Sequence, residues 1–262
     1  MNINKKNSLK TFINYTANYD LKNIGIALKI AHTYRVAELS ERIASVVANP
    51  QQIMNIEAAD FAWLLGIFHD IGRFEQITRY GTFKDAISID HAELGADILF
   101  CDGLFYDFIS DIEPSLTADE LNILKNIAEK AIRLHNKLKI PENIDNDTKM
   151  YTKILRDADK IDIFRVLNEA PYTGRNLKGL AVNEKIMQFV REHRCVPRTS
   201  INVHYNELEA LISQCCMAFE LEFDVSRQIA AKQGYLNKLL NYDNQQLSIL
   251  KSEVFNTWKI LL

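Results

Sequence analysis

Four histidines in the first 135 residues lie within or at the ends of apolar helical patterns, and two of them are next to an aspartate. They are His32, His69, His91 and His135. Asp70 follows one of them directly, Asp90 precedes another, and the pair Asp157 and Asp159 comes later in the chain. Imidazole nitrogens and carboxylate oxygens are the ligands that bind divalent zinc, manganese, iron, cobalt and nickel. These residue types therefore indicate a metal site.

Such a site needs inward-facing side chains from several helices, as in the metal centres of helical bundles. The four histidines fall one to a predicted helix. His69 and Asp70 would point about 100° apart on an ideal helix, but at a helix end both can reach one centre. A carboxylate can also bridge two metals, whereas a neutral imidazole cannot. A lone histidine is more often packed in the core or exposed at the surface, so only the whole set of histidines and carboxylates indicates a metal site.

The elements that would position these residues are helices. Glycine and proline are few, at nine and five residues, and apolar side chains recur every three or four residues nearly throughout. We expect a helix over residues 21–48 with Asp20 as its N-cap, and another over 57–70 that ends before Gly72. A polar connection follows over residues 79–90. Thr117 and Glu120 have the spacing of a capping box.

Further helices are predicted over residues 91–101, 117–135, 148–168, 183–193, 205–221, 223–240 and 243–260. No segment shows sustained period-two alternation, so the predicted fold class is all-α. The clearest break lies at residues 171–179, which carry proline, glycine and asparagine between the periodic segments. Residues 171–262 are expected to pack as helical cover on the same domain, where they would shape the pocket or form a homodimer interface.

Composition narrows the class of protein. The 31 basic and 34 acidic residues give a net charge of −3, so no single-sign field indicates bulk nucleic acid as a partner. The four cysteines form no C-x-x-C pair, which favours buried thiols in a reducing cytosol. No apolar stretch follows MNINKKNSLKTF as it would in a signal peptide, and none is long enough to span a membrane. The predicted location is the cytoplasm.

The order His32, His69-Asp70 and Asp159 resembles the H…HD…D signature of the HD-domain superfamily of metal-dependent phosphohydrolases. Four stretches carry the resemblance in order: HTYRVAELSERIA, LLGIFHDIGRFEQ, DHAELGADIL and ILRDADKID. The resemblance covers roughly residues 20–170 and implies an HD-domain helical bundle there, with residues 171–262 as a C-terminal helical extension.

The resemblance also implies a set of metal ligands. His32, His69, Asp70 and Asp159 would bind one metal, and Asp159 is favoured over Asp157 and Asp162 because the family's aspartate follows an alanine. His91 and His135 match the histidines that hold a second ion in two-metal members, with Asp70 bridging. The metal would be one or two divalent ions, drawn from manganese, iron, nickel, cobalt, zinc and magnesium.

The chemistry expected of this site is hydrolysis of a phosphate ester of a small phosphorylated molecule, for which a nucleotide is a candidate, by a metal-activated water. Asp70 and Arg73 are the predicted catalytic residues. Phosphoryl transfer depends on positioning and positive charge, which suggests substrate-binding side chains near the ligands. These are Arg73, Gln76, Arg35, Lys137 and Lys160.

Two alternatives remain open at this point. One is a di-iron oxygenase within the same superfamily, and the other is a regulatory or binding module that keeps the metal as a structural element. The sequence also departs from two subclasses of the superfamily. LHNKLKIPE lacks the glycine-tyrosine-proline run of the cyclic-dinucleotide hydrolases, and ADKID replaces the ADRLHN of the alarmone hydrolases. Both of those substrates are therefore less favoured.

Overall fold

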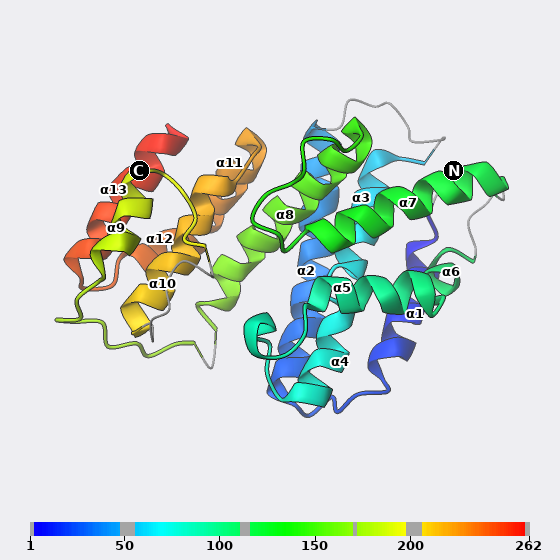
Figure 1. Cartoon of the computed structure of the whole chain (residues 1–262), viewed down its shortest axis with the longest axis horizontal. Coiled ribbons are helices and arrows are strands. Elements are labelled where there is room, and N and C mark those ends of the chain that lie inside the picture. The colour runs from blue at the N-terminus through cyan, green and yellow to red at the C-terminus, as the bar shows by residue number, and fades with distance from the viewer. Residues whose placement is uncertain (1–2, 48–55, 111–115, 170–171, 198–205, 260–262) are drawn as a thin grey trace. The chain divides into compact units, whose positions relative to one another are not determined.

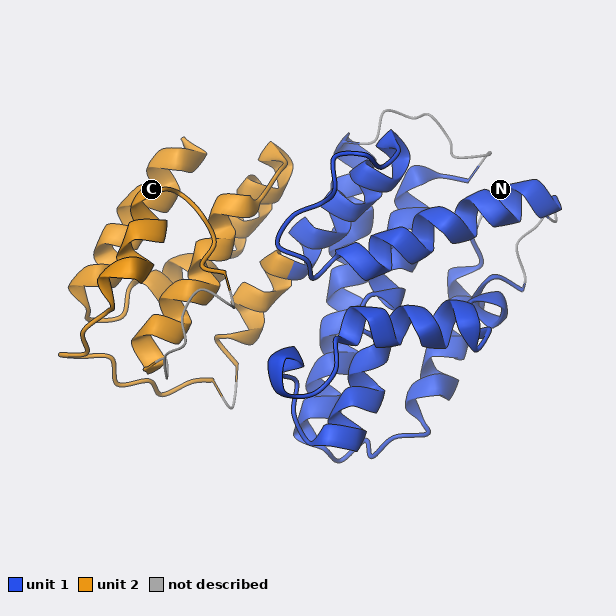
Figure 2. Cartoon of the chain, viewed as in Figure 1, with its two compact units in different colours: residues 1–159 blue, residues 160–262 orange. Residues whose placement is uncertain are grey.

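The computed structural model of the chain describes residues 3–47, 56–110, 116–169, 172–197 and 206–259. These residues form helices and contain no β-strand, which confirms the all-α prediction. The chain forms two compact units, residues 1–159 and 160–262 (Figure 2). The division falls inside helix α8 (Asn146–Val166), whereas the predicted boundary lies after it. The packing of residues 171–262 on the first domain stays a prediction.

The N-terminal unit contains the helices that carry the candidate ligands (Figure 1). In chain order they are α1 (Lys5–Thr16), α2 (Ile24–Val47), α3 (Ala58–Phe68), α4 (Ile71–Tyr80), the short η1 (Asp85–Ile87), α5 (His91–Ala96), η2 (Asp97–Cys101), α6 (Leu104–Ile109), α7 (Ala118–Leu134) and the first part of α8. The prediction for residues 91–101 corresponds to α5 continued by η2, a π-helical turn.

Helix α3 is the buried centre of this unit, and it packs along α2. Its residues are almost all apolar, so the helix is buried around its whole circumference rather than along one apolar face. Gly66 lets the two backbones meet, because a Cβ there would lie 2.4 Å from the Ala37 Cα. This close contact places His32, earlier on α2, beside His69 at the end of α3.

The predicted role of Gly72 as the end of the second helix was wrong. Helix α3 ends at Phe68, and a separate helix, α4, begins at Ile71 and contains Gly72. The glycine is needed for packing, since a Cβ there would lie 2.3 Å from the His91 backbone oxygen and 2.6 Å from the Gly95 nitrogen. The tight contact between α4 and α5 brings Asp70 and His91 together.

The helix starts agree with the sequence in one case and differ in another. Thr117 and Glu120 form the predicted capping box at the start of α7. Helix α2, however, begins at Ile24, and the side chain that caps it is Asn23, whose Oδ1 accepts from the backbone nitrogens of Gly25 and Ile26. Asp20 accepts instead from the Lys22 nitrogen in the preceding turn. The predicted end of this helix at residues 48–50 lies outside the described residues.

The C-terminal unit is also helical. Beyond the end of α8 it contains α9 (Glu184–Arg191), α10 (Glu207–Cys215), η3 (Cys216–Glu220), α11 (Asp224–Gln233), α12 (Tyr235–Leu240) and α13 (Gln245–Trp258). Gly234, with a φ of 73°, divides the predicted helix 223–240 into α11 and α12. Within the described parts of the chain, no helix is both long and apolar enough to span a membrane.

Candidate metal centre

Three side chains from three helices converge in the N-terminal unit. His32 projects from α2, His69 is the C-cap residue of α3, and Asp159 comes from α8. One ligand atom of each lies within 4.8 Å of those of the other two. Both imidazoles are buried, whereas the Asp159 side chain is 19% exposed. This first group therefore has a partly open side at Asp159.

A second group lies against the first and consists of Asp70, His91 and His135. Their ligand atoms also lie within 4.8 Å of one another, and all three side chains are buried. Asp70 precedes α4, His91 is the first residue of α5, and His135 is the C-cap residue of α7. The structure thus brings together all six residues that the resemblance implies as ligands.

Asp70 faces both groups with different oxygens. Its Oδ2 lies 3.3 Å from the His69 Nε2 and 3.5 Å from the His32 Nε2. Its Oδ1 lies 3.5 Å from the His91 Nε2. A carboxylate placed in this way can contribute one oxygen to each of two neighbouring cations.

The hydrogen bonds of the imidazoles determine which nitrogen faces the centre. The Nδ1 of His69 lies 2.7 Å from the Gly66 carbonyl oxygen, and that of His135 lies 2.7 Å from the Ile132 carbonyl oxygen. A carbonyl oxygen only accepts, so each Nδ1 carries the proton and donates. In the neutral imidazole the inward Nε2 then has a free lone pair.

The inward Nε2 atoms lie close to one another in pairs, and this donor set fits a metal. The Nε2 atoms of His32 and His69 are 3.3 Å apart, and those of His91 and His135 are 3.0 Å apart. Unprotonated Nε2 atoms of His91 and His135 at this distance would repel, and a shared cation would turn the repulsion into attraction. Nitrogen and oxygen donors together suit the divalent transition metals and zinc.

The protonation states favour binding of a cation. Burial, helped by His91 and His69, lowers the pKa of His135 to about 3. Burial and the charge of Arg73 also lower the pKa of His91. Both imidazoles are therefore neutral near pH 7, as metal ligands must be.

The two carboxylates of the centre are ionised. Burial alone would raise the pKa of Asp70, but Lys29, His69 and Arg73 hold it well below its usual range. For Asp159, burial is again outweighed, here by the hydrogen bond with His32 and the nearby imidazole of His69, and its pKa is lowered. The centre thus offers the neutral nitrogen donors of His91 and His135 and the anionic oxygen donors of its two carboxylates.

Comparison with known families agrees with this geometry. The model of the HD domain family matches residues 30–163. The chain belongs to the HD domain family. No curated protein and no solved structure matches it. HD domains bind divalent metals, and the matched segment includes all six converging residues.

A lysine beside these ligands, Lys29, was not among the predicted site residues. The Lys29 Nζ is 2.6 Å from the Asp70 Oδ2, and its side chain is 14% exposed. Lys29 is three residues before His32, so both side chains lie on one face of α2. That spacing was the signal available in the sequence.

Arg73 and Gln76 have partners within the HD domain. The Arg73 Nη1 donates to Gln76, to the Phe83 carbonyl oxygen and to Asp85, and its Nε lies 3.4 Å from the Asp70 Oδ1. Gln76 is buried and donates to the side chain of Asp85, to Ser88 and to the Ile89 carbonyl oxygen. Both side chains anchor the segment between α4 and α5, and substrate binding by them stays a prediction.

The other predicted substrate-binding cations lie in different settings. Lys137 pairs with Asp90 at 2.6 Å and with Glu93 at 3.0 Å. Lys160 is the first residue of the C-terminal unit and pairs with Glu220 at 2.9 Å. Arg35 is half-buried on α2, one turn after His32.

Among the described residues, neither Asp157 nor Asp162 joins a ligand group, in keeping with the preference for Asp159.

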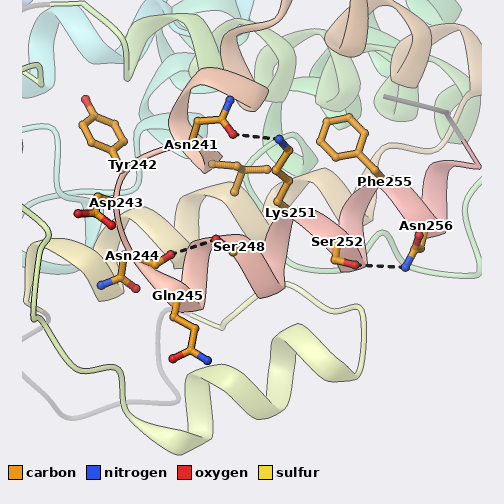
Figure 3. A pocket seen from close by; sticks show the side chains of 11 residues that line it. Asn241, Tyr242, Asp243, Asn244, Gln245, Ser248, Lys251, Ser252, Phe255 and Asn256 are labelled. Atoms are coloured by element: carbon orange, nitrogen blue, oxygen red, sulfur yellow. Dashed lines mark hydrogen bonds between the residues drawn. The ribbon is translucent and has the colours of Figure 1, made fainter.

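A surface hollow in the C-terminal unit is lined by residues from the end of α12, the following turn and one side of α13 (Figure 3). Its polar side chains are largely engaged with one another. Lys251 donates to the Asn241 side chain at 2.9 Å, and Asn256 donates to the Ser252 hydroxyl at 3.4 Å. The hollow contributes no residue to the two ligand groups.

Proposed function

We propose that this HD protein is a metal-dependent hydrolase that cleaves a phosphate ester of a small phosphorylated metabolite. The observation that carries the proposal is the position of Asp70, whose two oxygens face two separate groups of nitrogen and oxygen ligands. A one-metal structural site would not need a carboxylate shared in this way.

The donor set would hold one divalent ion through His32, His69, Asp70 and Asp159, and a second through Asp70, His91 and His135. Such ions supply Lewis-acid stabilisation of a phosphoryl group and acidify a water. The chain itself contributes two ionised carboxylates, imidazole nitrogens, of which those of His91 and His135 are neutral, and the ammonium group of Lys29. Lys29 is placed to attract a phosphate oxygen, because its side chain is partly exposed.

Nucleotides are the first substrate class to test. The nearly balanced charge of the chain, with a net value of −3, gives little reason to expect a long nucleic acid. The side chains of Asp159 and Lys29 are partly exposed, while the other five candidate ligands are buried. This limited exposure suits a phosphate at the end of a small molecule.

The test is a phosphate-release assay on protein that has been stripped of metal and reloaded separately with each of the six divalent ions. The panel includes nucleoside mono-, di- and triphosphates and phosphodiesters. We expect release with at least one ion, and a loss of about a hundredfold or more in Asp70→Ala. Asp102→Ala, which removes an exposed carboxylate, should keep full activity.

The same variants test the alternative of a structural metal. If Asp70→Ala lost folding stability in the metal-loaded protein while no ion gave phosphate release, the site would be structural and the proposal would be wrong. Oxygen uptake by the iron-loaded protein with a diol, without phosphate release, would favour the oxygenase.

A further inference from the structure

Asp85 lies outside both ligand groups but contacts one of their histidines. It is the first residue of η1, in the segment between α4 and α5. Its Oδ2 is 2.8 Å from the Nδ1 of His91, and its side chain is 12% exposed. Asp85 cannot be identified from the sequence, because nothing in the polar run before His91 distinguishes it from Asp90.

His91 differs from two other histidines of the centre in the partner of its outer nitrogen. The Nδ1 atoms of His69 and His135 donate to backbone carbonyl oxygens, whereas the Nδ1 of His91 donates to a carboxylate. A carboxylate partner fixes the tautomer of a ligand histidine and makes its other nitrogen more basic. The His91 Nε2, which faces Asp70 and His135, is the nitrogen affected.

Asp85 is itself held in place by donors on its other oxygen. The Arg73 Nη1 and the Gln76 Nε2 donate to its Oδ1 at 2.8 and 2.9 Å. A further contact comes from the Asn136 Nδ2, which lies 3.4 Å from the Oδ2. These contacts come from α4 and from the residue after His135, so the carboxylate is fixed relative to the helices that carry the second ligand group.

We propose that Asp85 is the positioning residue of the second metal, holding His91 in the Nδ1–H tautomer so that its Nε2 joins Asp70 and His135. This rests on the two-ion centre of the proposed function. One carboxylate oxygen of Asp85 also lies within 4.8 Å of a carboxylate oxygen of Asp90 and of a ring nitrogen of His91. That arrangement is not a third metal site, because Asp90 caps α5 and pairs with Lys137, and the Nδ1 of His91 is used by Asp85.

The test is metal binding by the full chain, measured by equilibrium dialysis against Mn²⁺, Fe²⁺, Co²⁺, Ni²⁺ and Zn²⁺, with the tightest-binding ion used for the variants. Wild-type protein should bind two ions. In Asp85→Asn the second ion should bind about 10- to 100-fold more weakly, while affinity for the first changes by less than about twofold. Asp85→Glu, which keeps the charge, should recover part of the loss.

A control separates this role from simple anchoring of the segment between α4 and α5. Ser88→Ala removes a hydroxyl that accepts from Gln76 and donates to the Lys84 carbonyl oxygen, without touching His91. It should bind both ions as wild type does. In the metal-free protein, ¹⁵N NMR of the imidazole should show His91 as the Nδ1–H tautomer in wild type and a mixture in Asp85→Asn.

The outcomes distinguish this inference from the function on which it rests. Two ions bound by Asp85→Asn with wild-type affinities would overturn the role of Asp85 alone. Equal loss of the second ion in Ser88→Ala would assign the effect to the segment and overturn it as well. If the wild-type chain bound fewer than two ions with each of the metals tested, both the two-ion centre and this inference would be overturned.

Discussion

At the scale of single residues, Lys29 has a contact that predicts two opposite effects. Its Nζ lies 2.6 Å from the Asp70 Oδ2, the oxygen that also faces His32 and His69. A metal ion and the ammonium group therefore compete for one carboxylate oxygen. Removing the ammonium should favour the metal and disfavour the anionic substrate.

We expect Lys29→Gln to bind the first divalent ion several-fold more tightly and to lose about tenfold or more in kcat/KM for a phosphate ester. Isothermal titration with the metal and steady-state kinetics measure the two effects. Lys22→Gln, which changes an exposed lysine before α2, is the control. A parallel loss of metal affinity and activity would show that Lys29 only supports the local structure.

The sequence identified the converging histidines and aspartates better than the charged side chains that contact them in the fold. His32, His69 and Asp159 could be identified because their order along the chain resembles a family signature. Lys29 offered only its three-residue spacing from His32, because its partner Asp70 lies 41 residues away and only folding brings the two near. Asp85 could not be identified, because its contact with His91, 6 residues away, depends on how the segment between them folds. Arg73 was identified by its closeness to Asp70, yet its contacts with Asp85 and Phe83 depend on how the following segment folds.

At the scale of helices, the periodicity of apolar residues located most elements, but the residues that end helices were harder to interpret. A glycine after an apolar helix is typical of a helix end, and Gly72 was interpreted in this way. In the fold it permits contact between α4 and α5, which no local pattern indicates. The real break, at His69 and Asp70, is where the chain places two ligands.

Gly72→Ala tests this contact. Alanine in place of a helical glycine should stabilise by about 0.5–1 kcal/mol, but here the added Cβ meets the backbone of α5 at 2.3 Å. We expect a net loss of about 1–3 kcal/mol in the free energy of unfolding and weaker binding of the second metal. Urea unfolding measures the first effect. The control is Thr78→Ala, at an exposed position of α4, which should change the free energy of unfolding by less than about 0.5 kcal/mol. A Gly72→Ala protein as stable as wild type would show that α4 and α5 can move apart without cost.

At the scale of the whole molecule, two compact units mean that unfolding need not be a single transition. The candidate metal ligands all lie in the N-terminal unit, so the pH dependence of stability that they cause must be followed in that unit. The two tryptophans make this feasible, because Trp63 lies in α3 of the N-terminal unit and Trp258 in α13 of the C-terminal unit. In a Trp258→Phe background, fluorescence reports the unfolding of the N-terminal unit.

In metal-free protein this unit should lose stability as the pH falls below about 6.5, the ordinary pKa of histidine. The pKa of His135 is lowered to about 3 in the fold, so between these values the unfolded chain binds a proton that the folded chain does not. Its contribution is fully present above pH 6.5 and declines by on the order of 1 kcal/mol per pH unit down to about 3. Urea unfolding at pH 7, 6, 5 and 4 in the presence of a chelator should show a shallower decline in His135→Asn. Identical slopes in the two proteins would contradict the lowered pKa of His135 in the fold.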